Sequence, residues 1–181
     1  MQHQLPSDSN SSVLDGHGAA KSHLNTLTIT RAAITDLLQV RRLERKAFKP
    51  GDRCSLWMFL LSLVLPSSML LVAKVDYWVV GHMLLVRDCD YHFANEISTI
   101  AVSFPFRRHG VAKLLIESYS KEHSDRPSLT LQVRRSNEWA IHLYEKIGFE
   151  FSETLLGCYD DGEDGHVYIK HIGQSDEDIV A

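Results

Sequence analysis

The order of strand-like and helix-like segments limits the fold of this chain more than any other feature of its sequence. Runs rich in apolar and β-branched residues indicate strands, and segments with apolar residues every three or four positions indicate amphipathic helices. Both kinds of segment mix within one stretch of chain, so the fold class is α+β, or α/β with a mixed sheet. The expected strands are residues 27–30, 69–75, 78–86, 96–102, 129–133, 149–155 and 166–172, and the expected helices are residues 37–48, 55–65, 111–121 and 137–147.

Turn and capping residues predict where several of these segments begin and end. The short link Asp76–Tyr77 indicates an antiparallel hairpin between the second and third strands. Pro66 ends the second helix. Ser136 is the expected N-cap of the fourth helix, and Gly148 stands where a glycine commonly ends a helix.

Size and composition indicate a single globular domain. The chain has 181 residues, of which 44% are hydrophobic and 23% are charged, and this length suits one domain with a sizeable core. We expect the domain to span residues 26–173. Residues 1–25 are polar and without an apolar core, which predicts a disordered tail and no secretory signal, and residues 174–181 form a second, shorter tail.

Charge, hydropathy and cysteine content argue against several partners. The net charge of −4 predicts no strong affinity for nucleic acid. The most apolar stretch, residues 56–65, is cut by Pro66 before it reaches the length of a membrane span. Cys54, Cys89 and Cys158 have no CxxC spacing, so neither a disulfide framework nor a metal site is expected, and a reducing cytoplasm is favoured. We further expect a monomer or a weak dimer.

The segment Arg107–Ala112 carries the most informative chemistry. Its pattern is basic-x-x-Gly-x-small, and it opens directly into the third predicted helix. Exposed N–H groups at a helix N-terminus favour a phosphate, and Gly110 and Ala112 keep side chains out of its way. Arg107 and Arg108 add positive charge. Because the same pattern also fits an ordinary helix start with two solvated arginines, it identifies no function alone.

Two longer segments resemble a known family. Residues 96–112, EISTIAVSFPFRRHGVA, are similar to motif A of the GNAT superfamily of N-acetyltransferases, and residues 131–149, LQVRRSNEWAIHLYEKIGF, are similar to motif B. Motif B and the ending CYDDGEDGHVYIKHI look like the RimI-like branch, whose members are N-terminal protein acetyltransferases. The resemblance runs from about Thr28 to Ile172. It implies the GNAT fold, a central twisted mixed sheet of seven strands flanked by about four helices.

The resemblance implies that acetyl-CoA binds where the fourth and fifth strands splay apart, with no metal. Its pantetheine arm would lie between the strands and its pyrophosphate on the loop described above. Asn137 matches a position whose side chain contacts the pantetheine arm, although a residue in a first helical turn can also satisfy local backbone groups. The matching cofactor-binding residues are Ile100, Ala101, Val102, Arg107, Arg108, His109, Gly110, Val111, Ala112, Lys113, Asn137 and Tyr144.

Tyr144 is the catalytic acid that the resemblance implies. It matches a tyrosine that lies near the thioester sulfur, and a positioned proton donor helps a thiolate to leave. A lone tyrosine on an apolar helix face is otherwise more often a core residue whose hydroxyl has found a partner. The family resemblance favours the catalytic role.

The base that assists the amine is less directly indicated. The attacking amine must be neutral, and an α-amine with a pKa of about 7.7–8.0 needs only modest help. Bacterial members of the branch often carry a glutamate at the position of Gln132, which cannot accept a proton usefully. Glu96 is the expected substitute, acting through water, and it fits equally an exposed carboxylate at a strand entry. His92 and His142 are weaker options.

The acceptor-facing residues follow from the same resemblance. Phe48 and Pro50 fall in the loop between the first two helices, which shapes the acceptor pocket in relatives, although Phe48 fits a core position equally well. Tyr159 matches a tyrosine that contacts the peptide backbone, and Cys158 stands where relatives carry another tyrosine. Gln132 completes the expected acceptor-binding set.

The predicted function is direct transfer of an acetyl group from acetyl-CoA to an amine. We expect the amine to be the N-terminal α-amine of a protein, as in acetylation of ribosomal proteins. One fold hosts many substrates, and Gln132 and Cys158 depart from the branch, so a small-molecule or lysine amine is the alternative acceptor. A non-catalytic acyl-CoA-binding module is a third interpretation, and Tyr144 argues against it.

Overall fold

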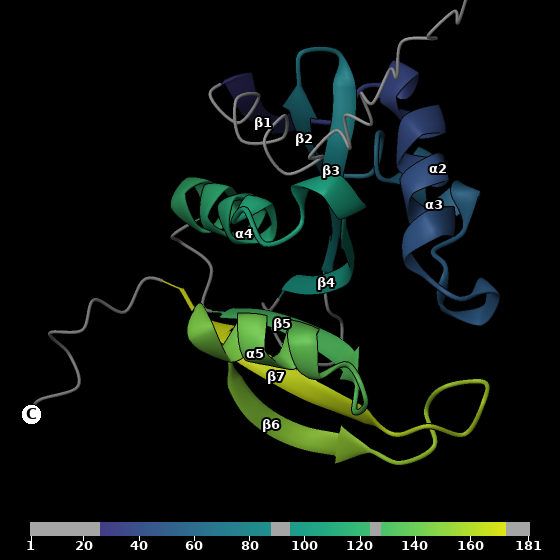
Figure 1. Ribbon diagram of the computed structural model, residues 1–181, viewed down its shortest axis with the longest axis vertical. Helices are drawn as coiled ribbons and strands as arrows, with labels where there is room; N and C mark the ends of the chain where they lie inside the picture. Colours follow the sequence, from purple (N-terminus) through teal and green to yellow (C-terminus); the bar gives the residue numbers. More distant parts are fainter. Residues whose placement is uncertain (1–25, 88–94, 124–127, 173–181) are drawn as a thin grey trace, which may run out of the picture.

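A seven-stranded sheet organises the protein. The computed structural model describes residues 26–87, 95–123 and 128–172 (Figure 1), so both predicted tails and His92 lie outside the described residues. The strands are β1 (Leu27–Arg31), β2 (Ser68–Val75), β3 (Trp78–Arg87), β4 (Asn95–Val102), β5 (Ser128–Arg134), β6 (Glu150–Leu155) and β7 (Gly165–His171). Their order in the sheet is β1-β2-β3-β4-β5-β7-β6. Only β4 and β5 pair in parallel among the described strands, so the sheet is mixed, as predicted.

Four α-helices and three short 3₁₀ turns accompany the sheet in the described part of the chain. The helices are α2 (Leu37–Ala47), α3 (Leu56–Leu61), α4 (Val111–Glu122) and α5 (Glu138–Lys146). The 3₁₀ turns are η2 (Ile34–Asp36), η3 (Pro50–Asp52) and η4 (Phe104–Phe106). The predicted number of strands and helices is therefore confirmed.

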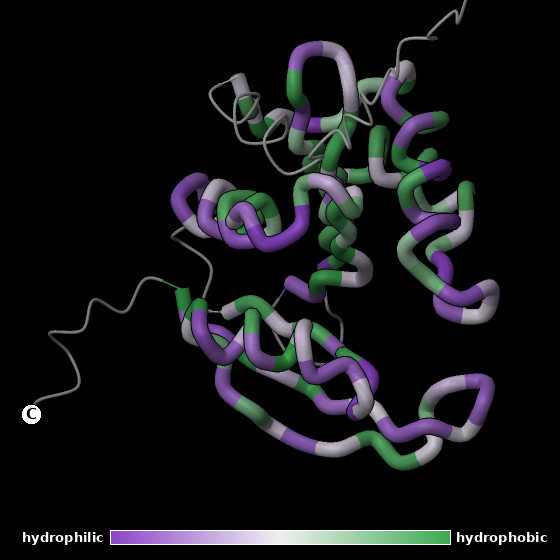
Figure 2. Tube along the Cα trace, in the orientation of Figure 1, coloured by the Kyte–Doolittle hydropathy of each residue, from purple (hydrophilic) through white to green (hydrophobic). Residues whose placement is uncertain are grey.

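Two apolar clusters lie on opposite faces of the sheet and attach the helices to it. On one face, Leu115 and Ile116 of α4 and Tyr144 of α5 pack against the central strands. On the other face, Val40 of α2 and Phe59 of α3 pack against β2 and β3. Figure 2 shows the hydrophobic residues concentrated on the central strands. The protein is thus a three-layer arrangement with the sheet in the middle.

The β2–β3 hairpin forms as predicted, and its second strand packs against the first residue of α4. Val75 pairs with Trp78 across the turn, and Asp76 takes a left-handed backbone conformation with φ of 54°, which a two-residue hairpin turn requires. Farther along β3, a Cβ added to Gly81 would lie 3.1 Å from Val111 Cγ1. The glycine therefore lets the first residue of α4 pack directly on β3.

Two predicted helix boundaries are wrong, each for a local reason. α3 ends at Leu61 instead of Leu65, because Ser62 donates a hydrogen bond from its hydroxyl to the Phe59 carbonyl and the chain continues in tight turns. The N-cap of α5 is Asn137 and not Ser136, since the Asn137 side chain accepts a hydrogen bond from Ala140 N. The predicted stop at Gly148 is confirmed by its φ of +88°.

Substitution of Leu115 tests the cluster beneath α4. Leu115 is fully buried, whereas the preceding residue, Leu114, is 43% exposed. Leu115→Ala is expected to lower the free energy of unfolding by about 2–5 kcal/mol, because it leaves a cavity. Leu114→Ala is the matched control and is expected to change it by about 0.5 kcal/mol. Urea denaturation followed by circular dichroism measures both, and equal losses would contradict this assignment of the core.

Candidate active site

A gap between β4 and β5 is the central feature of the candidate site. The two strands pair over only three positions, ending at Ile97 and Leu131. Beyond that point β5 stays paired with β7 through Arg134, but β4 and β5 separate. We call the space between residues 98–102 and residues 132–134 the β4–β5 gap. Backbone groups on its two edges lack a strand partner across it, so an extended molecule can pair with them. The expected splaying of the two strands is confirmed.

A β-bulge lies where the gap opens. Leu85 of β3 lies opposite Ile97, and Leu84 lies opposite Thr99, which leaves Ser98 as an extra residue on β4. The bulge changes the faces that neighbouring side chains occupy. Ile97 belongs to the cluster beneath α4 and α5, whereas Thr99 reaches Glu44 of α2 on the opposite face.

The loop before α4 has the shape expected of a phosphate cradle. Arg108 and Gly110 both take left-handed backbone conformations, with φ of 62° and 80°. Gly110 is the N-cap of α4 and offers no side chain to the first N–H groups of the helix. A Cβ added there would meet nothing within 4 Å. The helix N-terminus is therefore open toward the surroundings, where a pyrophosphate fits.

The side chains of this loop divide into two kinds. Arg107 folds back, since its Nε donates to the Val102 carbonyl at 3.0 Å, and His109 Nδ1 lies 2.8 Å from the Arg107 carbonyl. These two side chains shape the loop. Lys113 forms an exposed ion pair with Glu117 at 3.5 Å. Among the described residues Arg108 has no hydrogen-bond or ion-pair partner, so its guanidinium is free to meet a phosphate.

The remaining cofactor candidates line the β4–β5 gap or begin α4. Ile100 and Val102 pack against the cluster beneath α4 and α5, while Ala101 is buried. Val111 is buried as well, against Gly81. Ala112 follows it in the first turn of α4, where its backbone N–H has no acceptor within the helix.

The α5 helix carries two predicted site residues on the same face of the sheet as α4. Asn137 uses its carbonyl oxygen as the helix cap, at 3.3 Å from Ala140 N, which leaves its NH₂ group for another acceptor. Tyr144 is buried, with its ring 5.7 Å from that of Phe149. Burial, and to a smaller degree Tyr159, raises the pKa of the Tyr144 hydroxyl. The hydroxyl therefore stays protonated at physiological pH and can donate a proton.

Glu96 lies at the closed end of the gap. It pairs with Thr130 of β5 and points away from its neighbour Ile97, toward the face that α2 and α3 cover. The Thr130 hydroxyl is buried without a hydrogen-bond partner among the described residues. Glu96 and Tyr144 thus lie on opposite faces of the sheet. His142 is exposed on α5, as expected.

Two loops form the rim of the site on the α2–α3 face, and we call them the acceptor loops. They are residues 48–55, between α2 and α3, and residues 156–164, between β6 and β7, and they approach each other in Figure 1. Phe48 is half-buried and Pro50 is exposed. Tyr159 lies under the Arg134 guanidinium, whose Cζ is 4.0 Å from the ring centre.

Gln132 joins this rim from β5. Its Nε2 donates to Cys158 Sγ at 3.1 Å. Burial raises the pKa of Tyr159, and a hydrogen bond with Gln132 opposes that shift. Gln132, Cys158 and Tyr159 therefore form one hydrogen-bonded group beside the gap. The two positions at which the sequence departs from the RimI-like branch are in contact with each other.

The sequence alone did not single out Glu44, which anchors the first acceptor loop from inside. The residue is 1% exposed, and its carboxylate accepts hydrogen bonds from Cys54 N at 2.8 Å and from the Thr99 hydroxyl at 3.2 Å. The Nε2 of His82, which is also buried, lies 2.9 Å from the same carboxylate. This network links α2, β3, β4 and the start of α3. The only sequence signal was a charged residue next to Leu43 on the apolar side of α2.

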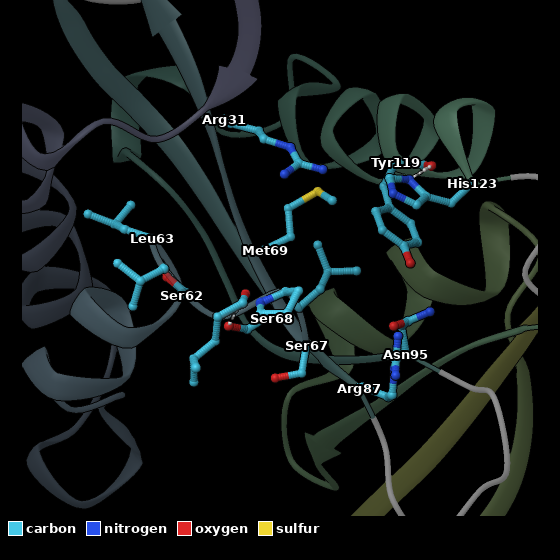
Figure 3. A pocket seen from close by; sticks show the side chains of 14 residues that line it. Arg31, Ser62, Leu63, Ser67, Ser68, Met69, Arg87, Asn95, Tyr119 and His123 are labelled. Atoms are coloured by element: carbon cyan, nitrogen blue, oxygen red, sulfur yellow. Dashed lines mark hydrogen bonds between the residues drawn. The ribbon is translucent and has the colours of Figure 1, made fainter.

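A separate cavity of about 210 Å³ lies at the paired end of β4, away from the gap. Figure 3 shows Arg31, Met69 and Tyr119 around it, with Ser67 and Ser68 on its floor. The rings of Tyr119 and His123 stack, with their centres 4.4 Å apart. Because the gap opens at the other end of β4, this cavity belongs to neither side of the candidate site.

The comparisons with known proteins agree with this geometry. The Acetyltransferase (GNAT) family matches residues 37–149. An N-alpha-acetyltransferase of Saccharolobus solfataricus is 29% identical over 163 residues, which are 82% of this chain and 95% of the relative. Since the family match covers more than half of the sequence, the chain belongs to the GNAT acetyltransferase family. It is accordingly an enzyme that transfers acetyl groups from acetyl-CoA.

Solved structures share the fold. The ribosomal-protein-S18-alanine N-acetyltransferase of Escherichia coli superposes with a TM-score of 0.71 at 24% identity, covering 83% of this chain and 97% of that one. NAA60 of Arabidopsis thaliana in complex with acetyl-CoA gives 0.72 at 19% identity, covering 82% and 100%. In the described part of our chain, no group of three or more His, Cys, Asp or Glu residues is arranged to hold a metal ion. None of the described helices is long and apolar enough to cross a membrane.

Removal of the Glu44 carboxylate tests the inner anchor. Glu44→Ala leaves Cys54 N and the Thr99 hydroxyl without their buried acceptor, so the free energy of unfolding is expected to fall by about 2–6 kcal/mol, at about 1–3 kcal/mol for each donor. Glu44→Gln retains part of the hydrogen bonding and is expected to lose less. Glu150→Ala, on an exposed position of β6, is the control. Urea denaturation checks the order, and a Glu44→Ala variant as stable as the control would disprove the anchor.

Proposed function

We propose that the protein acetylates the N-terminal α-amine of other proteins by direct transfer from acetyl-CoA. The observation that carries the proposal is the two-sided β4–β5 gap, with the phosphate cradle on one face of the sheet and the acceptor loops on the other. Relatives named N-alpha-acetyltransferase support the choice of an α-amine. Because acetyl-CoA and the acceptor amine would meet in one complex from opposite faces of the sheet, no covalent acetyl-enzyme is required.

On the face of the sheet that carries α4 and α5, the chain's own groups bind and orient acetyl-CoA, which supplies the activated acetyl thioester. The open N–H groups of α4 and the Arg108 side chain would hold the pyrophosphate. The unpaired edges of β4 and β5 would pair with the amides of the pantetheine arm, and the free NH₂ of Asn137 offers one more donor. Figure 1 shows α4 and the strands β4 and β5.

Proton transfer is divided between the two faces. The neutral amine attacks the acetyl carbon and a C–N bond forms, and Glu96 accepts, through a water molecule, the proton that this nitrogen loses. The C–S bond then breaks, and Tyr144 donates its proton to the leaving thiolate. Because Glu96 and Tyr144 lie on opposite faces, the base serves the incoming amine and the acid serves the departing thiol without competing for one proton.

The acceptor loops and Gln132 determine which acceptor binds. Residues 156–164 contain Asp160, Asp161, Glu163 and Asp164 and neither lysine nor arginine. Asp161, Glu163 and Asp164 are ion-paired with Lys49, Arg134 and Arg135. Asp160 has no ion-pair partner among the described residues, so an approaching α-ammonium group would meet it with a favourable charge. We further propose that Phe48, Pro50 and Tyr159 contact the first acceptor residues.

The setting of the enzyme is also a proposal from its sequence. Cys54 and Cys158 are free thiols, which suits a reducing cytoplasm. Action as a monomer or a weak dimer, independent of nucleic acid and membrane, stays a prediction. The domain limits of residues 26–173, with a tail on each side, stay a prediction as well.

A peptide panel tests the acceptor. Short peptides with a free α-amine are expected to be acetylated with release of CoA, measured by a thiol-reactive dye and by mass spectrometry. Both the test peptide and its matched control contain the same internal lysine, and the control differs only in having a blocked N-terminus. The control is expected to remain unmodified. Activity on that control or on polyamines, with none on any free N-terminus, would replace the proposal by the lysine or small-molecule alternative.

Tyr144→Phe tests the proton donor. We expect kcat to fall about 100-fold, the lower range for a lost general acid, while KM for acetyl-CoA changes little. Because burial raises the pKa of Tyr144, the acid stays protonated as the pH rises, so wild-type kcat is expected to show no decline between pH 8 and pH 10. Tyr168→Phe removes another tyrosine hydroxyl, one bonded to Glu145, and serves as the control. Equal kcat values for the two variants would remove Tyr144 from the mechanism.

A further inference from the structure

Arg134, at the end of β5, connects the two acceptor loops. Its guanidinium contacts Asp52 of the first loop with two hydrogen bonds, of 2.6 and 2.7 Å. It also contacts two carboxylates of the second loop, Asp161 at 2.9 Å and Glu163 at 2.7 Å. The same side chain covers the ring of Tyr159. One arginine thus holds three carboxylates that belong to two loops far apart in sequence.

The geometry differs from that of an ordinary surface ion pair. The Arg134 side chain is only 13% exposed, and that of Asp52 is 14% exposed. A planar guanidinium bound at both edges fixes direction as well as distance, which a single ammonium contact does not. Hydrogen bonding to Arg134 also lowers the pKa of Asp161 to about 2. Exposed single pairs contribute little to stability, but a partly buried, shared network is a geometric constraint.

Further contacts show how closely the loops and α5 are joined. A Cβ added to Gly51 would lie 2.6 Å from Asp160 Oδ2, so the loops are packed together there. Glu163 uses its second oxygen to accept a hydrogen bond from Ser136 N at 2.9 Å. The cluster therefore reaches the start of α5, the helix that carries Tyr144.

We propose that Arg134 is a positioning residue that holds the acceptor loops at a fixed separation and thereby sets the affinity for the acceptor peptide. The proposal rests on the proposed function, because the loops matter only if an acceptor lies between them. Without Arg134, three carboxylates would face each other across the loops, and in the described part of the chain Lys49 would be the one cation still paired with any of them, through Asp161. Mutual repulsion would then widen the rim and displace Tyr159.

The same geometry predicts what Arg134 leaves untouched. Its side chain belongs to neither of the two apolar clusters. The phosphate cradle of residues 107–113 begins α4 on the other face of the sheet. Arg134 contributes to the edge of the gap only through its backbone, which a side-chain substitution keeps, including the hydrogen bond from Asn137 N to the Arg134 carbonyl. Loss of the Arg134 side-chain contacts is therefore expected to affect acceptor binding and to spare the binding of acetyl-CoA.

Arg134→Met, Arg134→Lys and Arg135→Met test the proposal by steady-state kinetics. We expect Arg134→Met to raise KM for an acceptor peptide at least about tenfold, because it leaves a bidentate carboxylate unpaired, with kcat and KM for acetyl-CoA within about threefold of wild type. Arg134→Lys keeps the charge without the planar fork and is expected to fall in between. Arg135→Met removes the same charge from a side chain 66% exposed and 3.5 Å from Asp164, and it is expected to behave as wild type.

Several results would overturn the proposal. These are an unchanged peptide KM in Arg134→Met, a parallel rise in KM for acetyl-CoA, or an equal effect of Arg135→Met. Hydrogen exchange of residues 48–55 and 156–164 gives a readout that needs no acceptor. If wild type acetylates no peptide, the proposed function fails by itself. The positioning role then stands if exchange in both loops accelerates in Arg134→Met alone, and it falls if exchange is unchanged.

Discussion

The early end of the pairing between β4 and β5 is the constraint on which the rest of the site depends. After three paired positions, each strand keeps its outer neighbour and loses its inner one. A sheet normally leaves such edges only at its rim, because unpaired backbone groups inside a protein are costly. Here the edges lie in the middle of the molecule, and the loop before α4 stands at the end of one of them. These are the groups with which the arm of acetyl-CoA would pair under the proposed function.

Two networks of charged side chains, one centred on Glu44 and one on Arg134, hold the structure around this opening in different ways. Glu44 works from inside, where it connects α2 to Thr99 just beyond the bulge of β4. Arg134 works from outside, where it gathers carboxylates of the acceptor loops. The first loop, residues 48–55, is bound at its end by Glu44 and near its middle by Arg134, through Cys54 and Asp52. Its shape is therefore set before any acceptor arrives.

The sequence predicted the elements of the fold well and the site only in part. Strand and helix positions follow from local periodicity, and the errors at Leu65 and Ser136 concern single hydrogen bonds of Ser62 and Asn137. The splayed strands followed from a family resemblance and not from the residues themselves. Arg134 and Asp52 are 82 positions apart, and Glu44 and Thr99 are 55 apart. No spacing rule pairs them, because their proximity depends on the order of strands in the sheet.

The open edges of β4 and β5 have a consequence for the state of the acceptor. Under the proposed function the acceptor brings its amine to a thioester held between two strand edges, and an extended chain is the element that packs beside a strand, at about 4.8 Å. The acceptor loops are fastened to each other at the rim of the gap. The proposed acetylation would thus favour acceptors whose first residues are extended and have not yet packed against the rest of their chain.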